Sequence, residues 1–251
     1  MEQNTSFKVT ENHMDKRQVT VLEVRTRLEE MADEKYKEFH EKLVPGTTNI
    51  LGIRLPMMRG LAKELAKQDW RDWFHKAEDF YYEETMVRGL LMASAKMPLE
   101  ERFSYIREFV PYINNWAVCD SVCNTLKDAK KYPQEYWEFL DPYFHSENEY
   151  DLRFGTVMLL GYFVKEEYLE ESLKKLDAVH HDGYYVKMAV AWALSVYFAA
   201  FPDRVLLYLR EEHDLDAFTY KKTLQKILES YRVDKEMKQI IREMRGKNNG
   251  N

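Results

Sequence analysis

Apolar residues recur along this chain at the spacing of helices. From about residue 16 onwards they fall three or four positions apart, as in helices that bury one face. No alternation of period two, which would indicate a strand, lasts for more than a few residues. The pattern therefore predicts an all-α fold.

The N-terminal part of this pattern predicts three or four helices before any repetition begins. One helix begins near Lys16 and continues, with a break, to the Pro45-Gly46 pair, which ends it because proline cannot extend a helix and glycine suits its cap. A helix is predicted at 56–67, since Pro56 suits a first helical position. Asp69 is the predicted N-cap of a short helix after it. The apolar positions of the first stretch are Val19, Leu22, Leu28, Met31, Tyr36, Phe39 and Leu43.

Pairs of helices then repeat with a nearly constant period. Helix starts that contain proline lie at Pro98, Pro133 and Pro202, spaced by 35 and 69 residues, so the second interval spans two periods. Each start opens an amphipathic helix, and a short turn leads to a second helix. Two-helix units of this length are typical of α-solenoids, in which each unit packs on its neighbours and equivalent helices line a concave face.

One position in the second helix of each pair is polar although the residues that follow it are apolar. We expect it to line the concave surface near the helix N-termini, where the helix dipole adds positive potential. Four of its five occupants are basic, which predicts a positively charged stripe that attracts anions such as phosphate, extended by the neighbouring Lys222. The occupants, 32 to 34 residues apart, are Arg88, Asp120, Arg153, Lys187 and Lys221.

The overall charge modifies this picture without excluding it. A net charge of −6 argues against a general electrostatic grip on nucleic acid, but a basic stripe can lie on one face of an acidic protein. The lysines of 127–131 and 235–247 are interpreted as solvated faces. No apolar run reaches the roughly 18 residues of a membrane span, and residues 1–17 lack a signal-peptide core. We expect a cytoplasmic protein with no membrane partner, one domain at 17–245, a flexible arm at 1–16 and a flexible tail at 246–251.

The two cysteines, Cys119 and Cys123, lie four residues apart on one predicted helix. Helical geometry disfavours a disulfide between them, and no further cysteine or nearby histidine cluster would complete a metal site. We therefore predict two buried, small apolar side chains and no metal.

Asp120 is the only acidic residue in the stripe, and Trp116 precedes it by one helical turn on the same face. Two interpretations are open. Asp120 forms a salt bridge to Arg153 of the next repeat that keeps the stack in register, or it is a carboxylate held ionised in an anion-binding groove, where it stabilises a developing cation and orients water. Trp192, taken alone, is interpreted as a core residue.

Four segments of the chain, in their order and spacing on the repeat frame, resemble the AlkD-like DNA alkylation repair proteins, which are DNA glycosylases built from HEAT-like repeats. The likeness runs from about residue 36 to about residue 231. The segments are Leu51-Gly52-Ile53-Arg54-Leu55-Pro56 with Arg59, Asn115-Trp116-Ala117-Val118-Cys119-Asp120, Arg153-Phe154-Gly155 and Lys187-Met188-Ala189-Val190-Ala191-Trp192.

The resemblance implies an α-solenoid of HEAT-like antiparallel helix pairs with a concave basic groove for duplex DNA. It implies excision of purines alkylated at N3 or N7, without metal or organic cofactor. The family's catalytic aspartate matches Asp120, its two lesion-facing tryptophans match Trp116 and Trp192, and its groove arginine, which holds the DNA backbone, matches Arg153.

This chain departs from the family pattern at two places. Family members often carry an acidic residue directly after the first tryptophan, where this chain has Ala117. The region before Gly52 is also longer, so the family's N-terminal groove aromatic corresponds to either Tyr36 or Phe39.

We expect a monofunctional DNA N-glycosylase, a hydrolase for alkylated purines, that acts as a monomer. Two other functions stay open. One is a nucleic-acid-binding solenoid of the same fold without catalysis. The other is a protein–protein scaffold, which is a common use of solenoids and is favoured by the net acidity.

Overall fold

The computed structural model describes residues 17–247 as an all-helical chain. The predicted arm at 1–16 and residues 248–251 of the predicted tail lie outside the described residues. The only β-type pairing in 17–247 is an isolated bridge between Gln18 and Asp69. None of the helices in that range is long and apolar enough to cross a bilayer.

The described helices cover most of this range. The α-helices are α1 (Val21–Glu30), α2 (Glu34–His40), α3 (Leu55–Leu65), α4 (Arg71–Lys76), α5 (Tyr82–Ser94), α6 (Leu99–Phe109), α7 (Trp116–Cys123), α8 (Pro133–Leu140), α9 (Glu149–Tyr162), α10 (Leu169–Asp177), α11 (Tyr184–Ala200), α12 (Pro202–Leu207), α13 (Ala217–Glu229) and α14 (Lys235–Lys247). Four 3-10 segments, η1 (Val110–Tyr112), η2 (Lys127–Lys130), η3 (Asp141–His145) and η4 (Glu166–Tyr168), and the π-helical η5 (Tyr208–Glu212) lie between them.

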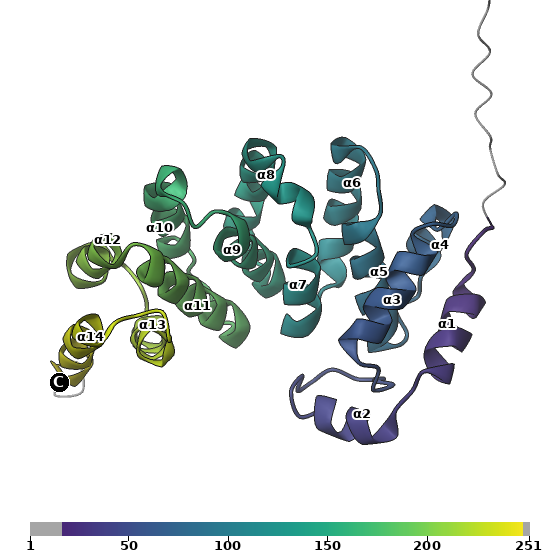
Figure 1. Ribbon diagram of the computed structural model, residues 1–251, viewed down its shortest axis with the longest axis horizontal. Coiled ribbons are helices and arrows are strands. Elements are labelled where there is room, and N and C mark those ends of the chain that lie inside the picture. The colour runs from purple at the N-terminus through teal and green to yellow at the C-terminus, as the bar shows by residue number, and fades with distance from the viewer. Residues whose placement is uncertain (1–16, 248–251) are drawn as a thin grey trace, which may run out of the picture.

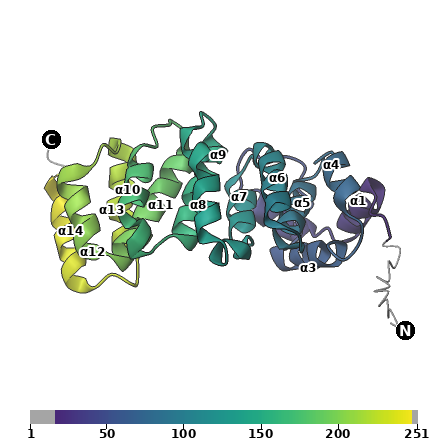
Figure 2. The same cartoon turned by 90° about the horizontal axis from the view of Figure 1, so that it is seen from above.

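The helices follow one another around an arc, with α1 and α14 at opposite ends (Figures 1 and 2). Helices α6, α8, α10 and α12 lie on the outer side, whereas α5, α7, α9, α11 and α13 lie along the inner side (Figure 1). Each of these inner helices packs against the next one in the series, and α3 packs against α5. The predicted α-solenoid architecture is confirmed.

Proline marks the starts of outer helices, as the sequence predicts. Pro98 is the N-cap of α6, while Pro133 and Pro202 are the first residues of α8 and α12. Its fixed φ suits the first turn, where its missing N–H would have no helical partner. On the inner side, the side chain of Asn115 caps α7 by accepting a hydrogen bond from the Val118 amide at 3.0 Å.

Two local predictions near the N-terminus are wrong. Helix α1 begins only at Val21, so Leu22 is 74% exposed instead of lying on the apolar side. Asp69 does not cap α4, whose N-cap is Trp70. The Asp69 backbone instead pairs with that of Arg17 and Val19. The helix pattern had placed residues 17–19 within the first helix and Asp69 at the start of a later one, whereas in the structure their backbones pair in extended conformation.

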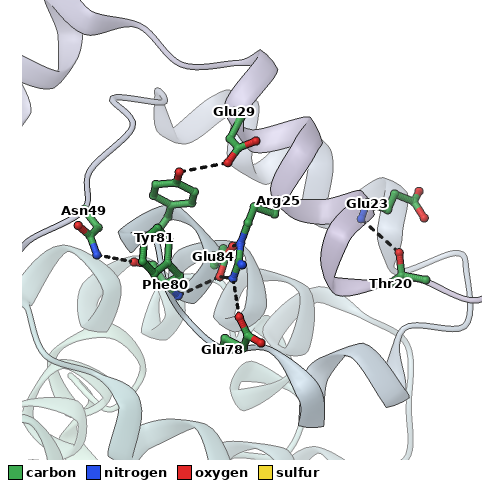
Figure 3. A network of polar contacts seen from close by, with 9 residues as sticks. All are labelled: Thr20, Glu23, Arg25, Glu29, Asn49, Glu78, Phe80, Tyr81 and Glu84. Carbon is green, nitrogen blue, oxygen red and sulfur yellow. Dashed lines mark hydrogen bonds and ion pairs between the residues drawn. The ribbon is translucent and has the colours of Figure 1, made fainter.

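A guanidinium–carboxylate pair docks α1 onto the array (Figure 3). Arg25 donates to both carboxylate oxygens of Glu84 on α5, from Nε at 2.6 Å and from Nη2 at 3.2 Å, and Nη2 also reaches Glu78 at 3.0 Å. The Glu84 side chain is only 4% exposed. The Tyr81 hydroxyl adds a hydrogen bond to Glu29 of α1. A two-point contact of this kind holds both groups in one orientation.

The segment between α2 and α3 is bound to the start of α5. The buried Glu83 carboxylate accepts hydrogen bonds from the three amides of residues 51–53, at 2.9 to 3.2 Å. The Asn49 side chain donates to the Phe80 carbonyl at 3.1 Å (Figure 3), and the Tyr82 amide donates to the Asn49 carbonyl. The region that is longer than in the resembled family is therefore ordered by specific contacts.

Cys119 and Cys123 are free and buried within α7, as predicted. Burial raises the pKa of the Cys123 thiol, and the thiolate is the reactive form. We expect neither cysteine to react with an aromatic disulfide reagent in the folded protein, and both to react after denaturation in guanidinium chloride. The absorbance of the aromatic thiolate that the reagent releases measures how many cysteines react. Rapid titration of a thiol in the folded protein would contradict the packing.

Candidate functional site

Asp120 and Arg153 form a two-point ion pair between neighbouring inner helices. Arg153 on α9 donates from Nε to Oδ1 at 3.0 Å and from Nη2 to Oδ2 at 2.9 Å of Asp120 on α7. The guanidinium side chain is 7% exposed and the carboxylate 15% exposed. The salt bridge of the first interpretation is thus present, and the carboxylate has more access to solvent than its partner.

Arg153 is also bound to the next inner helix. Its Nη1 donates to the Tyr185 carbonyl at the start of α11, at 2.5 Å. Glu149, one turn before Arg153, accepts hydrogen bonds from the amides of Tyr185 at 2.6 Å and Val186 at 3.3 Å. Polar contacts therefore join α7, α9 and α11 in series.

Glu149 was missed by the sequence analysis. The only signal was its position four residues before Arg153, the same spacing that separates Trp116 from Asp120.

The predicted phosphate contact of Arg153 is not favoured by its surroundings. Each of its three guanidinium nitrogens already donates to a protein oxygen, and the residue is buried.

The electrostatics of Asp120 reflect burial and pairing in opposition. Burial raises the pKa of the Asp120 carboxyl, and the Arg153 guanidinium opposes that rise. With a guanidinium on both oxygens, we expect the group to be ionised at neutral pH. Arg153 uses one acceptor site on each oxygen, and a carboxylate offers about four. No other hydrogen bond to this carboxylate is formed within residues 17–247, so its remaining sites can accept from water or face a positive charge.

Trp116 lies one turn before Asp120 on α7, and it links this helix to the segment that follows α2. Its Nε1–H donates to the Leu43 carbonyl at 2.9 Å, a contact across 73 residues of sequence. The ring is partly buried against the core. Trp116 thus lies close to Asp120 along α7 and receives its orientation from the N-terminal part of the array.

Trp192 lies about two helical turns beyond the point where α11 contacts this group. It is partly buried on α11, seven residues beyond Tyr185, which corresponds to about 10 Å along the helix axis. Within residues 17–247 no ring contact or hydrogen bond joins Trp192 to Trp116, Asp120 or Arg153. Of the four predicted catalytic residues, Asp120 and Arg153 are therefore joined by hydrogen bonds, and Trp116 lies one turn before Asp120 on α7.

The two candidate N-terminal aromatics differ in exposure. Tyr36 is half-buried, with the Arg54 guanidinium 4.5 Å from its ring centroid and the His40 ring at 5.5 Å. Phe39 is 55% exposed. Both belong to α2, which directly precedes the Leu43 carbonyl that holds Trp116. The choice between them stays a prediction.

Arg88, predicted to bind phosphate, is instead buried at 2% exposure. Its Nη2 lies 2.7 Å from an Asp79 carboxylate oxygen, and its guanidinium lies 4.1 Å from the Tyr112 ring centroid. Burial raises the pKa of Asp79 to about 6 against the attraction of Arg88. Neighbouring elements thus cover this position of the stripe, so the expectation that Arg88 lines the surface is wrong.

The C-terminal lysines of the stripe are more accessible. Lys187 is 21% exposed and lies between Asp182 at 3.5 Å and Asp216 at 3.6 Å. Lys221 is exposed, whereas Lys222 is half-buried and donates to the Gln225 side chain. The surface cations of the stripe therefore gather at α11 and α13.

Trp116→Phe should weaken the link between α7 and the segment after α2. Removal of the indole N–H leaves the Leu43 carbonyl without this donor, which costs about 0.5–1.5 kcal/mol beyond the loss of ring area. Urea denaturation measures the free energy of unfolding. Trp137→Phe is the control, because Trp137 is also partly buried but its indole N–H makes no hydrogen bond within the described chain. Equal losses for both variants would contradict a contribution from the bond.

Fold and site together define an α-solenoid with a paired carboxylate and an indole on its inner helices. No group of three or more His, Cys, Asp or Glu side chains in residues 17–247 is arranged to hold a metal ion. A profile of the family described as DNA alkylation repair enzyme matches residues 24–228, so the chain belongs to that family. This confirms the resemblance seen in the sequence and supports a role in DNA alkylation repair. A search of curated proteins gave no match.

Proposed function

We propose that this protein is a monofunctional DNA glycosylase that excises purines alkylated at N3 or N7 from duplex DNA. The observation that carries the proposal is the Asp120 carboxylate, held by Arg153 through both oxygens and still reachable from solvent. Membership of the DNA alkylation repair family supports DNA as the partner.

The chemistry needs little more than this carboxylate. An alkylated purine is cationic and leaves as a neutral base when the electron pair of its bond to C1′ moves onto the ring nitrogen. Positive charge then develops on the deoxyribose, as in the oxocarbenium-like state of glycoside hydrolysis. Asp120 stabilises that charge and orients a water, whose oxygen bonds to C1′ and whose proton passes to solvent. No general acid is required.

The other site residues act around Asp120. Arg153 is a positioning residue, because it holds both Asp120 oxygens and is itself anchored to the Tyr185 carbonyl. Trp116 and Trp192 offer indole faces to the cationic base or sugar. Lys187, Lys221 and Lys222 hold backbone phosphates, whereas Arg88 has no part in the proposal because it is buried.

The test is release of 7-methylguanine from methylated duplex DNA, followed by chromatography of the free base. We expect release without added metal or cofactor, and an abasic site in the product strand. Binding of duplex DNA without release would overturn the proposal in favour of a non-catalytic DNA-binding protein. Absence of binding at low salt would exclude both functions and favour a protein scaffold.

A further inference from the structure

A second feature, at the C-terminal ends of α5 and α7, lies outside the predicted stripe. A pocket of about 560 Å³ opens between the C-terminal half of α3, the link from α5 to α6 and the segment that follows α7. Its lining is strongly basic in a chain whose net charge is −6. The cations are Arg59, Lys63, Lys96, Arg102, Lys127 and Lys131, and the only acidic residue in the lining is Asp128.

Arg102 and Asp128 both have a structural role that explains their presence in the lining. Arg102 donates to the carbonyls of Met92 and Ala95, which closes the C-terminal end of α5. Its Nε donates to Asp128 at 3.1 Å, and Asp128 also accepts the Tyr136 hydroxyl at 2.7 Å. This pair is buried or half-buried and self-compensating, so it leaves the charge of the other cations unbalanced.

The four lysines of the pocket have no such compensation. Lys63, Lys96, Lys127 and Lys131 are exposed, and none forms an ion pair with a carboxylate in residues 17–247. Lys131 interacts with the Tyr132 side chain, whose ring centroid lies 4.7 Å from the lysine ammonium nitrogen. Like charges around one concavity repel each other and focus a positive potential that attracts anions. Lysines that serve only to solvate the surface gain no stability from being placed around one concavity, where they repel each other.

The wall of the pocket leads directly to Asp120. Arg59 donates to the Thr125 hydroxyl at 2.9 Å, and that hydroxyl donates to the Ser121 carbonyl at 2.7 Å. Thr125 follows Asp120 by five residues, or about 7.5 Å at the helical rise. The pocket therefore lies within about two helical turns of Asp120 along the chain.

We propose that this pocket binds backbone phosphates of the damaged duplex close to the alkylated base. The inference rests on the proposed function, since it needs DNA on the inner side of the arc. The pocket complements the lysines of α11 and α13, which lie on the C-terminal side of Asp120 along the array. DNA is then held on both sides of the reacting nucleotide.

The experiment compares a K127Q/K131Q variant with wild-type protein by fluorescence anisotropy on undamaged duplex DNA over a range of salt concentrations. We expect the dissociation constant to rise at least about tenfold near 50 mM salt, and the slope of log K against log salt to fall by about 2, since each lost contact contributes about 0.9. In base release, KM rises while kcat at saturating DNA stays within about twofold.

The matched control is K76Q/K174Q, which removes the same charge from two exposed lysines on α4 and α10. These make only local pairs with Asp72 and Glu171, and their loss should leave both the affinity and the salt slope unchanged. Equal effects in the two double variants would contradict phosphate binding by the pocket and would show that only the net charge of the protein matters.

A further arm separates the backbone from free polyphosphate as the ligand. Tripolyphosphate is titrated in a thermal-shift assay against both double variants. Lysine-dependent stabilisation by tripolyphosphate without any change in DNA affinity would overturn the assignment to the DNA backbone. The binding readout is independent of catalysis. If K127Q/K131Q lowers DNA affinity but the wild-type protein releases no base, the phosphate pocket stands and only the glycosylase proposal fails. If the wild-type protein releases base but K127Q/K131Q binds DNA normally, the glycosylase proposal stands and the pocket fails.

Discussion

Asp120→Asn should lower the rate of 7-methylguanine release by about 10²–10³-fold while duplex binding stays within a few-fold. Removal of one group that stabilises charge developing in a transition state has an effect of this size. Asparagine keeps the shape and one acceptor oxygen but loses the negative charge that opposes the sugar cation. Single-turnover release and anisotropy on the same DNA measure the two effects separately.

The same substitution also disturbs the fold, because Arg153 is buried and loses half of its pairing. Breaking a buried pair costs about 3–5 kcal/mol, and the partial exposure of Asp120 places the expected loss below that range. Release must therefore be measured at a temperature at which circular dichroism shows the variant to be folded.

Glu84→Gln is the matched control for that loss. Glu84 is also contacted by an arginine through both oxygens and is nearly buried, but it joins α1 to α5 (Figure 3) and has no part in the proposed chemistry. We expect this variant to lose comparable stability and to retain wild-type release. Wild-type release by Asp120→Asn would leave Asp120 as a register contact between repeats, as in the first interpretation of the sequence.

Gly52→Ala should be among the most destabilising single substitutions in the N-terminal half. Gly52 has φ +84°, which costs an alanine about 1–2 kcal/mol. A Cβ there would also lie 2.4 Å from the Asp33 carbonyl oxygen and 2.6 Å from the Lys37 amide nitrogen. Both are backbone atoms of the α2 region and cannot rotate away, so overpacking adds about 1–3 kcal/mol.

Gly46→Ala separates the two contributions. Gly46 has the same φ of +84°, but a Cβ there meets nothing within 4 Å. We expect it to lose only the conformational part, about 1–2 kcal/mol, in urea denaturation with an unchanged m value. Since Glu83 binds the Gly52 amide and the same segment reaches Trp116 through Leu43, Gly52→Ala should also slow base release. Similar losses for the two glycines would refute the close approach of α2.

Periodicity predicted the fold and one long-range contact. Residues 33 apart on equivalent helices, Asp120 and Arg153, face each other because a repeat of constant length places equivalent positions side by side. Proline starts, the buried cysteines and the membership of the family also follow from local sequence. The proline starts and the cysteines depend on residues within one helix, and the family likeness depends on the order and spacing of short segments, so the linear sequence is sufficient to see them.

The accessibility and partners of the long polar side chains emerged only in three dimensions. Arg88 and Arg153 occupy equivalent helix positions to Lys187, yet both are buried and paired, while Lys187 keeps part of its surface. Lys127 and Lys131, which looked like a solvated run, share a pocket with Lys63 of a helix more than sixty residues earlier. Helical phase sets the direction in which a side chain leaves its helix. What it meets depends on elements remote in sequence, and that decides whether a cation is desolvated, neutralised or left to bind an anion.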